Sequence, residues 1–408
     1  VNDAPGPPAA SMFMAIPEDT TNPWGKPVSD FAATLSDPDT GALKGIAVTE
    51  ATGSNGIWQY TLDNGSSWQS MGEVSVSSAR LLPADGNTVR VRFVPNPDFN
   101  GYVYFGYYGW DQTQGTVGAL YDASVRGGTT AFNSGYSAVS QNVTALNDAP
   151  TALIASVSLT PVNEDTANPA GDTVASLLGA SFSDARDQVT GGSSANSFAG
   201  VAVVANAASG AGEGAWQWYN GTSWTDIGTS VSTSSALTLA PDTLVRFLPS
   251  AEYNGTPGAL TVRLIDNSAG AVTSGSTLTV GAGGGTTRYS DSSNAVTLTT
   301  SITPVNDAPV GLPVITGTVS EDQVLTADTS GLSDIDGLGA LNYQWLRGGT
   351  AMSGATAATY TLGDSDVGAN IAVTVSYMDG GGTAESVTSA AVGPVVNVND
   401  APVVTMAM

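Results

Sequence analysis

The sequence predicts an all-β protein of three tandem β-sandwich domains in an elongated array, and three observations lead to this prediction. The pentapeptide Val-Asn-Asp-Ala-Pro opens the chain and returns, once with Leu for Val, at 146–150, 305–309 and 398–402. Between the copies, short alternating apolar segments are separated by turns rich in Gly, Asn and Pro, a pattern typical of strands. No segment has sustained helical periodicity with caps, so we expect almost no helix beyond single turns.

Length and composition fit this organisation. A chain of 408 residues is long enough for two to four domains. With 41% hydrophobic residues each unit can bury a core, and 49 Gly with only 12% charged residues suit short strands joined by turns. The pentapeptides place the domains at 1–146, 147–305 and 306–398, and they make 399–408 the start of a following repeat. We therefore expect the chain to be a segment of a longer protein.

The chemistry of the pentapeptide suits a joint between domains. Proline favours an extended conformation for the residue before it, and Asn and Asp form turns by bonding their own backbone. The Asn and Asp side chains also place oxygen atoms at the boundary, where a hard cation such as calcium could bridge two units. The alternative is a plain turn between domains, and the residues alone leave both interpretations open.

The charge balance excludes some partners. The chain has 11 basic and 36 acidic residues, a formal net charge of -25. Binding to nucleic acid or to an anionic membrane surface depends on Lys and Arg, so neither is expected, whereas cations are the natural counterpart. The alternative role of the charge is solubility. No window reaches 18 apolar residues, so direct membrane insertion is not expected either.

The residue types argue against an enzyme. The chain has neither His nor Cys, which removes Ser-His-Asp and Cys-His sites, His-ligated zinc and any disulfide framework. Paired carboxylates could still hydrolyse glycosides. Here the Asp pairs recur in turns of every unit, which is not expected of an active site.

Alternation and turn signals mark the strands of the first unit. Segment 45–49 is a predicted strand, and 57–62 alternates before Asp63-Asn64-Gly65, a strong hairpin signal. Segment 88–94 alternates with period two, so one face is apolar and the other carries two Arg. Segment 102–110 is an aromatic strand that ends at Asp111.

The second unit repeats this order. Segment 164–169 matches 18–23 with one change in six, and 245–249 aligns on 91–95 without gaps. Repeats of this size are whole domains that have diverged. Tryptophans recur at matching places and are expected to be sandwich core or hairpin pairs: Trp58, Trp68, Trp110, Trp216, Trp218 and Trp224.

The third unit is shorter and of a different kind. Its predicted strand 343–346 carries Trp345, and a later strand, 371–377, ends on Tyr377. A Trp on a middle strand with a Tyr on a late one fits an immunoglobulin-like sandwich core, here without a Cys pair.

These motifs resemble known repeats. The first two units resemble cadherin-like repeats of giant bacterial surface proteins and adhesins, through Glu-Asp-Thr-x-Asn-Pro, the Trp hairpins, Val-Arg-Phe-x-Pro and the pentapeptide linker. The third unit resembles bacterial immunoglobulin-like repeats, through 343–346, 358–362, 366–368 and 377–380. The resemblance covers nearly the whole chain and is specific for protein class, not for ligand.

The resemblance implies calcium at the domain junctions, held by linker Asn/Asp and by acidic residues of adjoining loops. Carried over by position, the candidate metal ligands are Asn2, Asp3, Glu18, Asp19, Asp37, Asp39 and Asp111 in the first unit; Asn147, Asp148, Glu164, Asp165, Asp184, Asp187 and Asp266 in the second; and Asn306, Asp307, Glu321, Asp322, Asp334, Asp336 and Asp379 in the third. The linker lacks a second Asn after Asp, and Arg186 adds a positive charge in the second unit.

The function expected from the resemblance is structural. The chain would be an extender segment of a large extracellular bacterial adhesin or surface filament protein, at the cell surface, with neighbouring copies or modules of the same protein as partners. The alternative is an adhesion module that binds a surface carbohydrate or protein through the aromatic strand of the first domain. Three residues of that strand are the candidate ligand contacts: Tyr102, Tyr104 and Tyr107.

Overall fold

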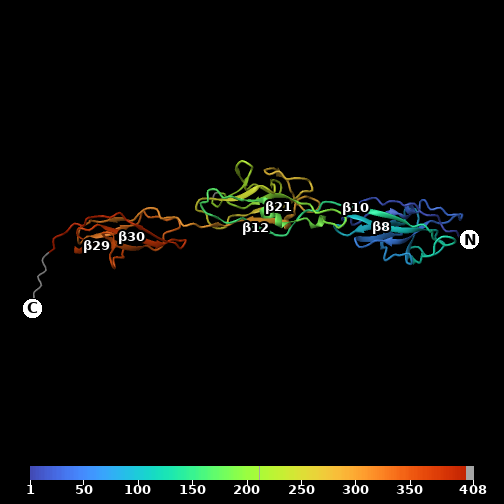
Figure 1. Ribbon diagram of the computed structural model, residues 1–408, viewed down its shortest axis with the longest axis horizontal. Helices are drawn as coiled ribbons and strands as arrows, with labels where there is room; N and C mark the ends of the chain where they lie inside the picture. Colours follow the sequence, from blue (N-terminus) through green and yellow to red (C-terminus); the bar gives the residue numbers. More distant parts are fainter. Residues whose placement is uncertain (211, 401–408) are drawn as a thin grey trace, which may run out of the picture.

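A computed structural model describes residues 1–210 and 212–400. The chain forms three all-β units that follow one another along the long axis, with the N-terminus at one end (Figure 1). The expected start of a following repeat, 399–408, lies outside the described residues except for its first two. Within the described part, no helix is long and apolar enough to span a membrane.

The first unit is a sandwich of two sheets. One sheet has six strands, in the order β1 (Ile16–Pro17), β10 (Ser137–Thr144), β8 (Gly101–Trp110), β3 (Gly45–Ala51), β6 (Ala79–Pro83) and β9 (Leu120–Tyr121). The other has four, in the order β2 (Lys26–Pro27), β7 (Arg90–Pro95), β4 (Gly56–Thr61) and β5 (Gln69–Ser70). The single turn α1 (Val28–Phe31) buries Val28 and Phe31 between them.

The second unit repeats this topology strand for strand. Its six-stranded sheet runs β12 (Ser156–Ser158), β23 (Ala295–Thr299), β21 (Leu260–Asp266), β16 (Phe198–Asn206), β19 (Ala236–Leu239) and β22 (Thr277–Leu278). Its four-stranded sheet runs β14 (Asp172–Thr173), β20 (Leu244–Pro249), β17 (Gly214–Tyr219) and β18 (Trp224–Asp226). The two units therefore share one order of strands in their sheets.

Short elements complete the second unit. Two strand pairs flank the sandwich: β11 (Thr151–Ala152) with β15 (Phe182–Ser183), and β13 (Val162–Asn163) with β24 (Ile302–Thr303). The helical elements are α2 (Val174–Leu178), η1 (Gly179–Ser181), η2 (Ala185–Asp187) and η3 (Ser292–Asn294). They are single turns, as the sequence predicts.

The third unit is a smaller sandwich. Three strands form one sheet, β25 (Val314–Thr316), β26 (Val324–Asp328) and β29 (Thr359–Thr361). Four form the other, β28 (Thr350–Ala351), β27 (Asn342–Arg347), β30 (Ile371–Met378) and β31 (Ala384–Thr388), and η4 (Asp364–Asp366) is its one helical turn among the described residues. The all-β tandem architecture is therefore as predicted.

Tryptophan and phenylalanine fill the cores. Trp58 faces Phe93 across β4 and β7, and Trp216 faces Phe247 at the equivalent place in the second unit. Trp345 is fully buried in the third unit. Burying aromatic rings is the largest single source of stability in such small sandwiches, so these residues hold the sheets together.

The Arg-bearing face of 88–94 is covered, which the alternation did not indicate. The Arg92 guanidinium lies 3.9 Å from the Trp68 ring centroid, and Arg246 lies 4.0 Å from that of Trp224. Each Arg also donates from Nε to a glutamine on the neighbouring strand, at 2.8 Å. Cation–π stacking thus places both hairpin tryptophans on the outside of the four-stranded sheets.

Candidate metal sites at the joints

In the first unit, a Glu-Asp pair lies at the end of the sandwich that faces the second unit, and hydrogen bonds fix both side chains. Buried Glu18 accepts hydrogen bonds from the side chain of Asn100, at 2.9 Å, and from the backbone N–H of Leu146. Asp19 has φ of 59°, in the left-handed region, and its carboxylate accepts the backbone N–H of Asp98 at 2.9 Å. The last strand and the turn before β8 therefore present these carboxylates toward the next unit.

The linker is fixed on its other side by the unit that follows. The backbone N–H of Asp148 donates to Asp187 at 3.0 Å, and the side chain of Asn147 donates to Asp266 at 3.3 Å. Asn196 donates to both Asn147 and Asp187, at 3.0 and 2.7 Å. The Asn-Asp dipeptide is thereby held against the loops of the second unit.

The first joint brings carboxylates of two units and the linker together. Glu18 of the first unit, Asp148 of the linker and Asp187 of the second unit place carboxylate oxygens within 4.8 Å of one another. Asp19 and Asp98 form a second such group with Asp148. Among the described residues, neither unit alone supplies every member of these groups, so each group forms only where the two units meet.

The electrostatics of the first joint are those of uncompensated acids. Burial and, after it, the charges of Asp98, Asp19 and Asp187 raise the pKa of Asp148 to about 6, against a lowering effect of Arg186. Burial, followed by repulsion from Asp187, also raises the pKa of Asp184 to about 6 against a lowering hydrogen bond from the Asn196 backbone. Arg186 is mostly exposed and stays 4.0 Å from Asp148, so it offsets little of this charge.

The residues fit a hard divalent cation. Calcium takes 6–8 oxygen ligands, largely carboxylates and amide or backbone carbonyls. Four buried carboxylate oxygens have no hydrogen-bond partner in the described part of the chain, and all belong to predicted ligands: Asp37, Asp184, Asp307 and Asp379. A buried carboxylate oxygen without a donor is costly unless a cation satisfies it.

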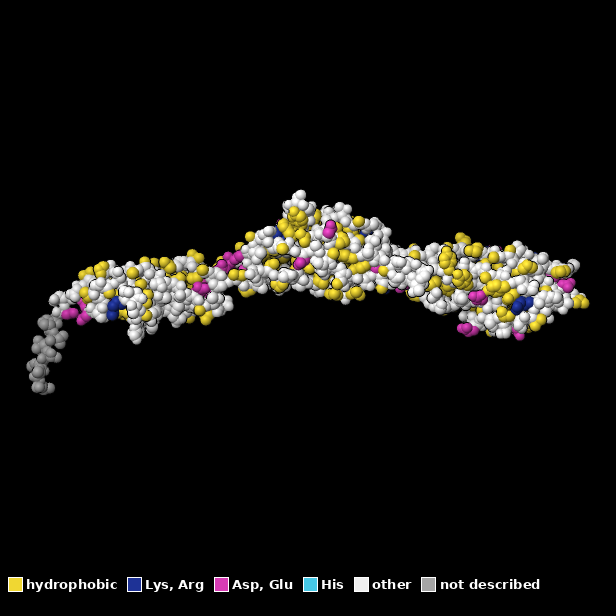
Figure 2. Space-filling view, viewed as in Figure 1, with side chains coloured by type: hydrophobic (Ala, Val, Ile, Leu, Met, Phe, Trp, Pro, Cys, Tyr) yellow, Lys and Arg dark blue, Asp and Glu magenta, His cyan; other side chains and the backbone are white. Residues whose placement is uncertain are grey.

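The second joint repeats the first in part. Glu164 accepts from Asn254 at 2.8 Å and from the Val305 N–H at 2.6 Å. Oxygens of Asp165, Glu252 and the linker Asp307 lie within 4.8 Å of one another. Asp and Glu side chains gather at this narrow neck between the units (Figure 2).

Half-sites of the same kind lie at the two ends of the chain. At the start, Asn2 donates to Asp111 at 2.9 Å and the Asp3 N–H donates to Asp39 at 2.8 Å, with Asp37 beside them. At the other end, Glu321, Asp364 and Asp400 form an acidic group within 4.8 Å, beside Asp322.

The structure divides the predicted ligand sets differently from the sequence. Within the first unit, Glu18 and Asp19 lie at one end, and the other five predicted ligands lie at the opposite end. The predicted ligands that lie close together therefore come from two neighbouring units and not from one. In the third unit the Asn306 side chain bonds Glu385, at 2.9 Å, and the Tyr377 hydroxyl donates to Asp334 at 2.6 Å. Asp336 accepts the Asp307 N–H at 2.8 Å, as Asp187 accepts that of Asp148.

Sequence reasoning missed several members of the sites. Asp98, Glu252 and Asp364 each complete an acidic group, and Asn100 and Asn254 position the Glu. The signal was present: Asp98 and Glu252 occupy the same place, two residues before Asn-Gly, in segments that align without gaps.

The three tyrosines proposed as ligand contacts do not share a face. Tyr102 and Tyr104 are 61% and 54% exposed on the outer face of β8. Tyr107 is fully buried, with its ring 5.5 Å from Phe31 and 5.7 Å from Phe105. Tyr107 therefore offers no surface to a ligand, and only the other two could contact one.

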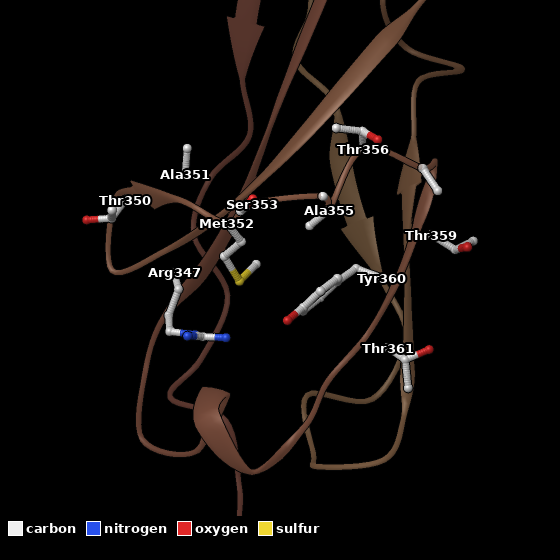
Figure 3. A pocket seen from close by; sticks show the side chains of 12 residues that line it. Arg347, Thr350, Ala351, Met352, Ser353, Ala355, Thr356, Thr359, Tyr360 and Thr361 are labelled. Carbon is white, nitrogen blue, oxygen red and sulfur yellow. The ribbon is translucent and has the colours of Figure 1, made fainter.

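A groove of about 710 Å³ lies in the third unit. Arg347, Met352 and Tyr360 line it between β28 and β29 (Figure 3). Arg347 donates to buried Asp366 at 2.6 Å, and Tyr360 donates to the same carboxylate at 2.9 Å. Arg347 and Tyr360 are thus joined through one buried carboxylate.

The raised pKa values predict that stability of the calcium-free protein falls as pH rises from about 4 to 6. Folded Asp148 and Asp184 hold their protons up to about pH 6, against an ordinary pKa of 3.8. The folded state therefore binds more protons than the unfolded state in this window, and unfolding becomes easier as they leave. In buffer passed over chelating resin, we expect the midpoint of thermal unfolding to be lower at pH 7 than at pH 5. Each kcal/mol of lost stability should lower this midpoint by about 2–4 °C. A midpoint that rises over this window would contradict the assignment.

Comparisons with known proteins give similar architectures only. No protein-family model matches the chain, and no curated protein matches it. Solved structures similar to it are tandem cadherin domains. Mouse cadherin-23 EC22-24 is 12% identical, with 97% of this chain and 100% of that chain covered and a TM-score of 0.44. Protocadherin gamma B2 domains 1–5 are 13% identical, with 97% and 60% covered and a TM-score of 0.44.

Proposed function

We propose that this chain is a structural extender segment of a large extracellular bacterial surface protein or adhesin, and that calcium stiffens its joints. The domains are proposed at 1–146, 147–305 and 306–398. One observation carries the proposal: the carboxylates of Glu18, Asp148 and Asp187 converge from one unit, the linker and the next unit. A site that needs both neighbours couples cation binding to their relative orientation.

The proposed mechanism is the removal of repulsion at each joint. Two like unit charges about 4–5 Å apart repel by roughly 3–4 kcal/mol at an effective dielectric constant of about 20. The acidic groups hold three carboxylates within 4.8 Å, so repulsion opposes the closed arrangement of a metal-free joint. Calcium, when bound, would supply positive charge, and the carboxylates of Glu18, Asp148 and Asp187 would be the residues that hold it.

The chain's own residues orient the ligands. Asn100 and the Leu146 N–H fix Glu18, and the Asp148 N–H and Asn196 fix Asp187. Pre-positioned ligands lose less conformational entropy when a cation binds. Extracellular modules bind calcium with dissociation constants of about 10⁻⁴–10⁻³ M, so the stiffness of the array would follow the calcium of the medium.

Small-angle X-ray scattering tests the proposal. We expect the calcium-loaded chain to show an extended, well-defined profile. Excess chelator should shorten the maximum dimension and broaden the distance distribution, because a joint that loses its cation gains hinge freedom. Magnesium at equal concentration is the control, since its smaller octahedral site suits these clusters less. An unchanged profile on chelation would mean that side-chain packing alone sets the shape.

A further inference from the structure

The two joints differ in how their equivalent asparagines are placed. Asn100 and Asn254 occupy the same position in their units, and each donates to the buried Glu of its Glu-Asp pair, at 2.9 and 2.8 Å. Asn100 is only 3% exposed, whereas Asn254 is exposed. A segment of the second unit therefore covers Asn100, whereas no described segment of the third unit covers Asn254 in the same way.

The cover is the loop 187–193 of the second unit. The Ser193 N–H donates to the Asn100 side-chain oxygen at 2.7 Å, and Asn100 donates to the Ser193 hydroxyl at 2.8 Å. That hydroxyl donates in turn to the Asp187 carbonyl at 2.6 Å. The side-chain amide of Asn100 thus both donates a hydrogen bond to Ser193 and accepts one from it. These two bonds fix the first unit against the second.

The loop approaches Asn100 so closely that it requires glycine. A Cβ on Gly192 would lie 2.2 Å from the side-chain oxygen of Asn100 and 2.7 Å from its carbonyl oxygen. The backbone of Gly192 is outside the left-handed region, so the requirement comes from the contact and not from its own conformation. Direct packing between units is therefore part of the first joint.

The second joint has only the linker and its acidic group. Among residues 151–303 and 310–400, no hydrogen bond joins the second unit directly to the third. A thin single strand of chain connects these units, while the first two lie close together (Figure 1). Domains joined without a sizeable interface move relative to each other by default.

We propose that Asn100 and the loop 187–193 form a latch that holds the first joint without metal, which leaves the second joint as the calcium-controlled hinge. The hinge half of this inference rests on the proposed function, and the latch half does not. In calcium-free medium the array would be a rigid pair of units with a freely moving third.

The test measures each joint separately in the full chain. The sequence has no cysteine, so one cysteine introduced on an exposed residue of each neighbouring unit labels a single joint for fluorescence energy transfer. In calcium-free buffer we expect a narrow distance distribution across the first joint and a broad one across the second. Added calcium should narrow the second and leave the first unchanged.

Two variants open the latch by different means. Gly192→Val inserts bulk against Asn100, and the distribution across the first joint should at least double in width without calcium. Ser193→Ala removes only the hydroxyl contacts and should widen it less. Ser194→Ala, at the neighbouring exposed serine, is the matched control and should change nothing. Hydrogen exchange in the strands of both units checks that each variant is folded.

The outcomes separate the two ideas. A first joint as broad as the second in the calcium-free wild type, or unchanged in folded Gly192→Val, would overturn the latch. A second joint that calcium does not narrow would overturn the calcium proposal and the hinge, while a narrow first joint would still support the latch.

Discussion

Truncating Trp216 to alanine is expected to lower the free energy of unfolding of the second unit by about 3–5 kcal/mol. The side chain is fully buried, and its ring meets that of Phe247 edge-on at 5.3 Å between centroids. Its indole N–H donates to the Gly258 carbonyl at 2.8 Å, so truncation also leaves that acceptor unpaired. Because the cavity lies between two sheets, little relaxation can fill it.

Urea unfolding measures this loss, with hydrogen exchange recorded separately for each of the three units. Protection should fall in β17 and β20 and stay unchanged in the third unit. Trp24→Ala makes the same chemical change at a side chain that is 65% exposed, and it should cost less than about 1 kcal/mol. A loss below 1 kcal/mol for Trp216→Ala would mean that the core of the second unit does not depend on this ring.

Repetition in the sequence made the architecture predictable. Trp58 and Trp216 stand before aligned Val-Arg-Phe strands, and both pair with the Phe of that strand. A sequence pattern that recurs in two diverged copies indicates that both copies pack in the same way. A pattern seen in one copy indicates only the local preference of its residues for a strand or a turn. The covering of Arg92 by Trp68 was not predictable, because alternation gives the two faces of a strand and not what lies over each.

The limits of the site prediction have physical causes. Period-two alternation separates Tyr102 and Tyr104 from Tyr107, and grouping them ignored that rule. The metal ligands were grouped by unit because sequence order groups them so, but a strand carries its two ends to opposite poles of a sandwich. Glu18 and Asp111 are therefore far apart, while Glu18 and Asp187 meet.

Replacing Asp148 with asparagine is expected to stabilise the calcium-free protein and to abolish most of the calcium binding at the first joint. The raised pKa of Asp148 means that its charge opposes folding at pH 7, so a neutral isostere removes that cost. The same carboxylate belongs to both acidic groups of the joint, so its loss weakens the cation site twice.

The size of the calcium response follows from mass action. With a dissociation constant of about 10⁻⁴–10⁻³ M, 10 mM calcium stabilises a one-site protein by about 1.4–2.7 kcal/mol. In chemical denaturation the wild-type protein should gain this amount for each occupied site, and Asp148→Asn should lose most of the part that the first joint contributes. Isothermal calorimetry should show correspondingly fewer or weaker sites, with those of the second joint retained.

Asp63 provides a control, because neutralising it should change the free energy of unfolding in the opposite direction. Hydrogen bonds from Ser67 and Thr61 lower the pKa of Asp63 to about 2, so this charge favours folding. Asp63→Asn should therefore destabilise the calcium-free protein and leave its calcium response intact. If both variants shift stability in the same direction, the environment assigned to Asp148 is wrong. If Asp148→Asn gains stability but keeps the full calcium response, the carboxylates at the first joint repel one another without forming the cation site.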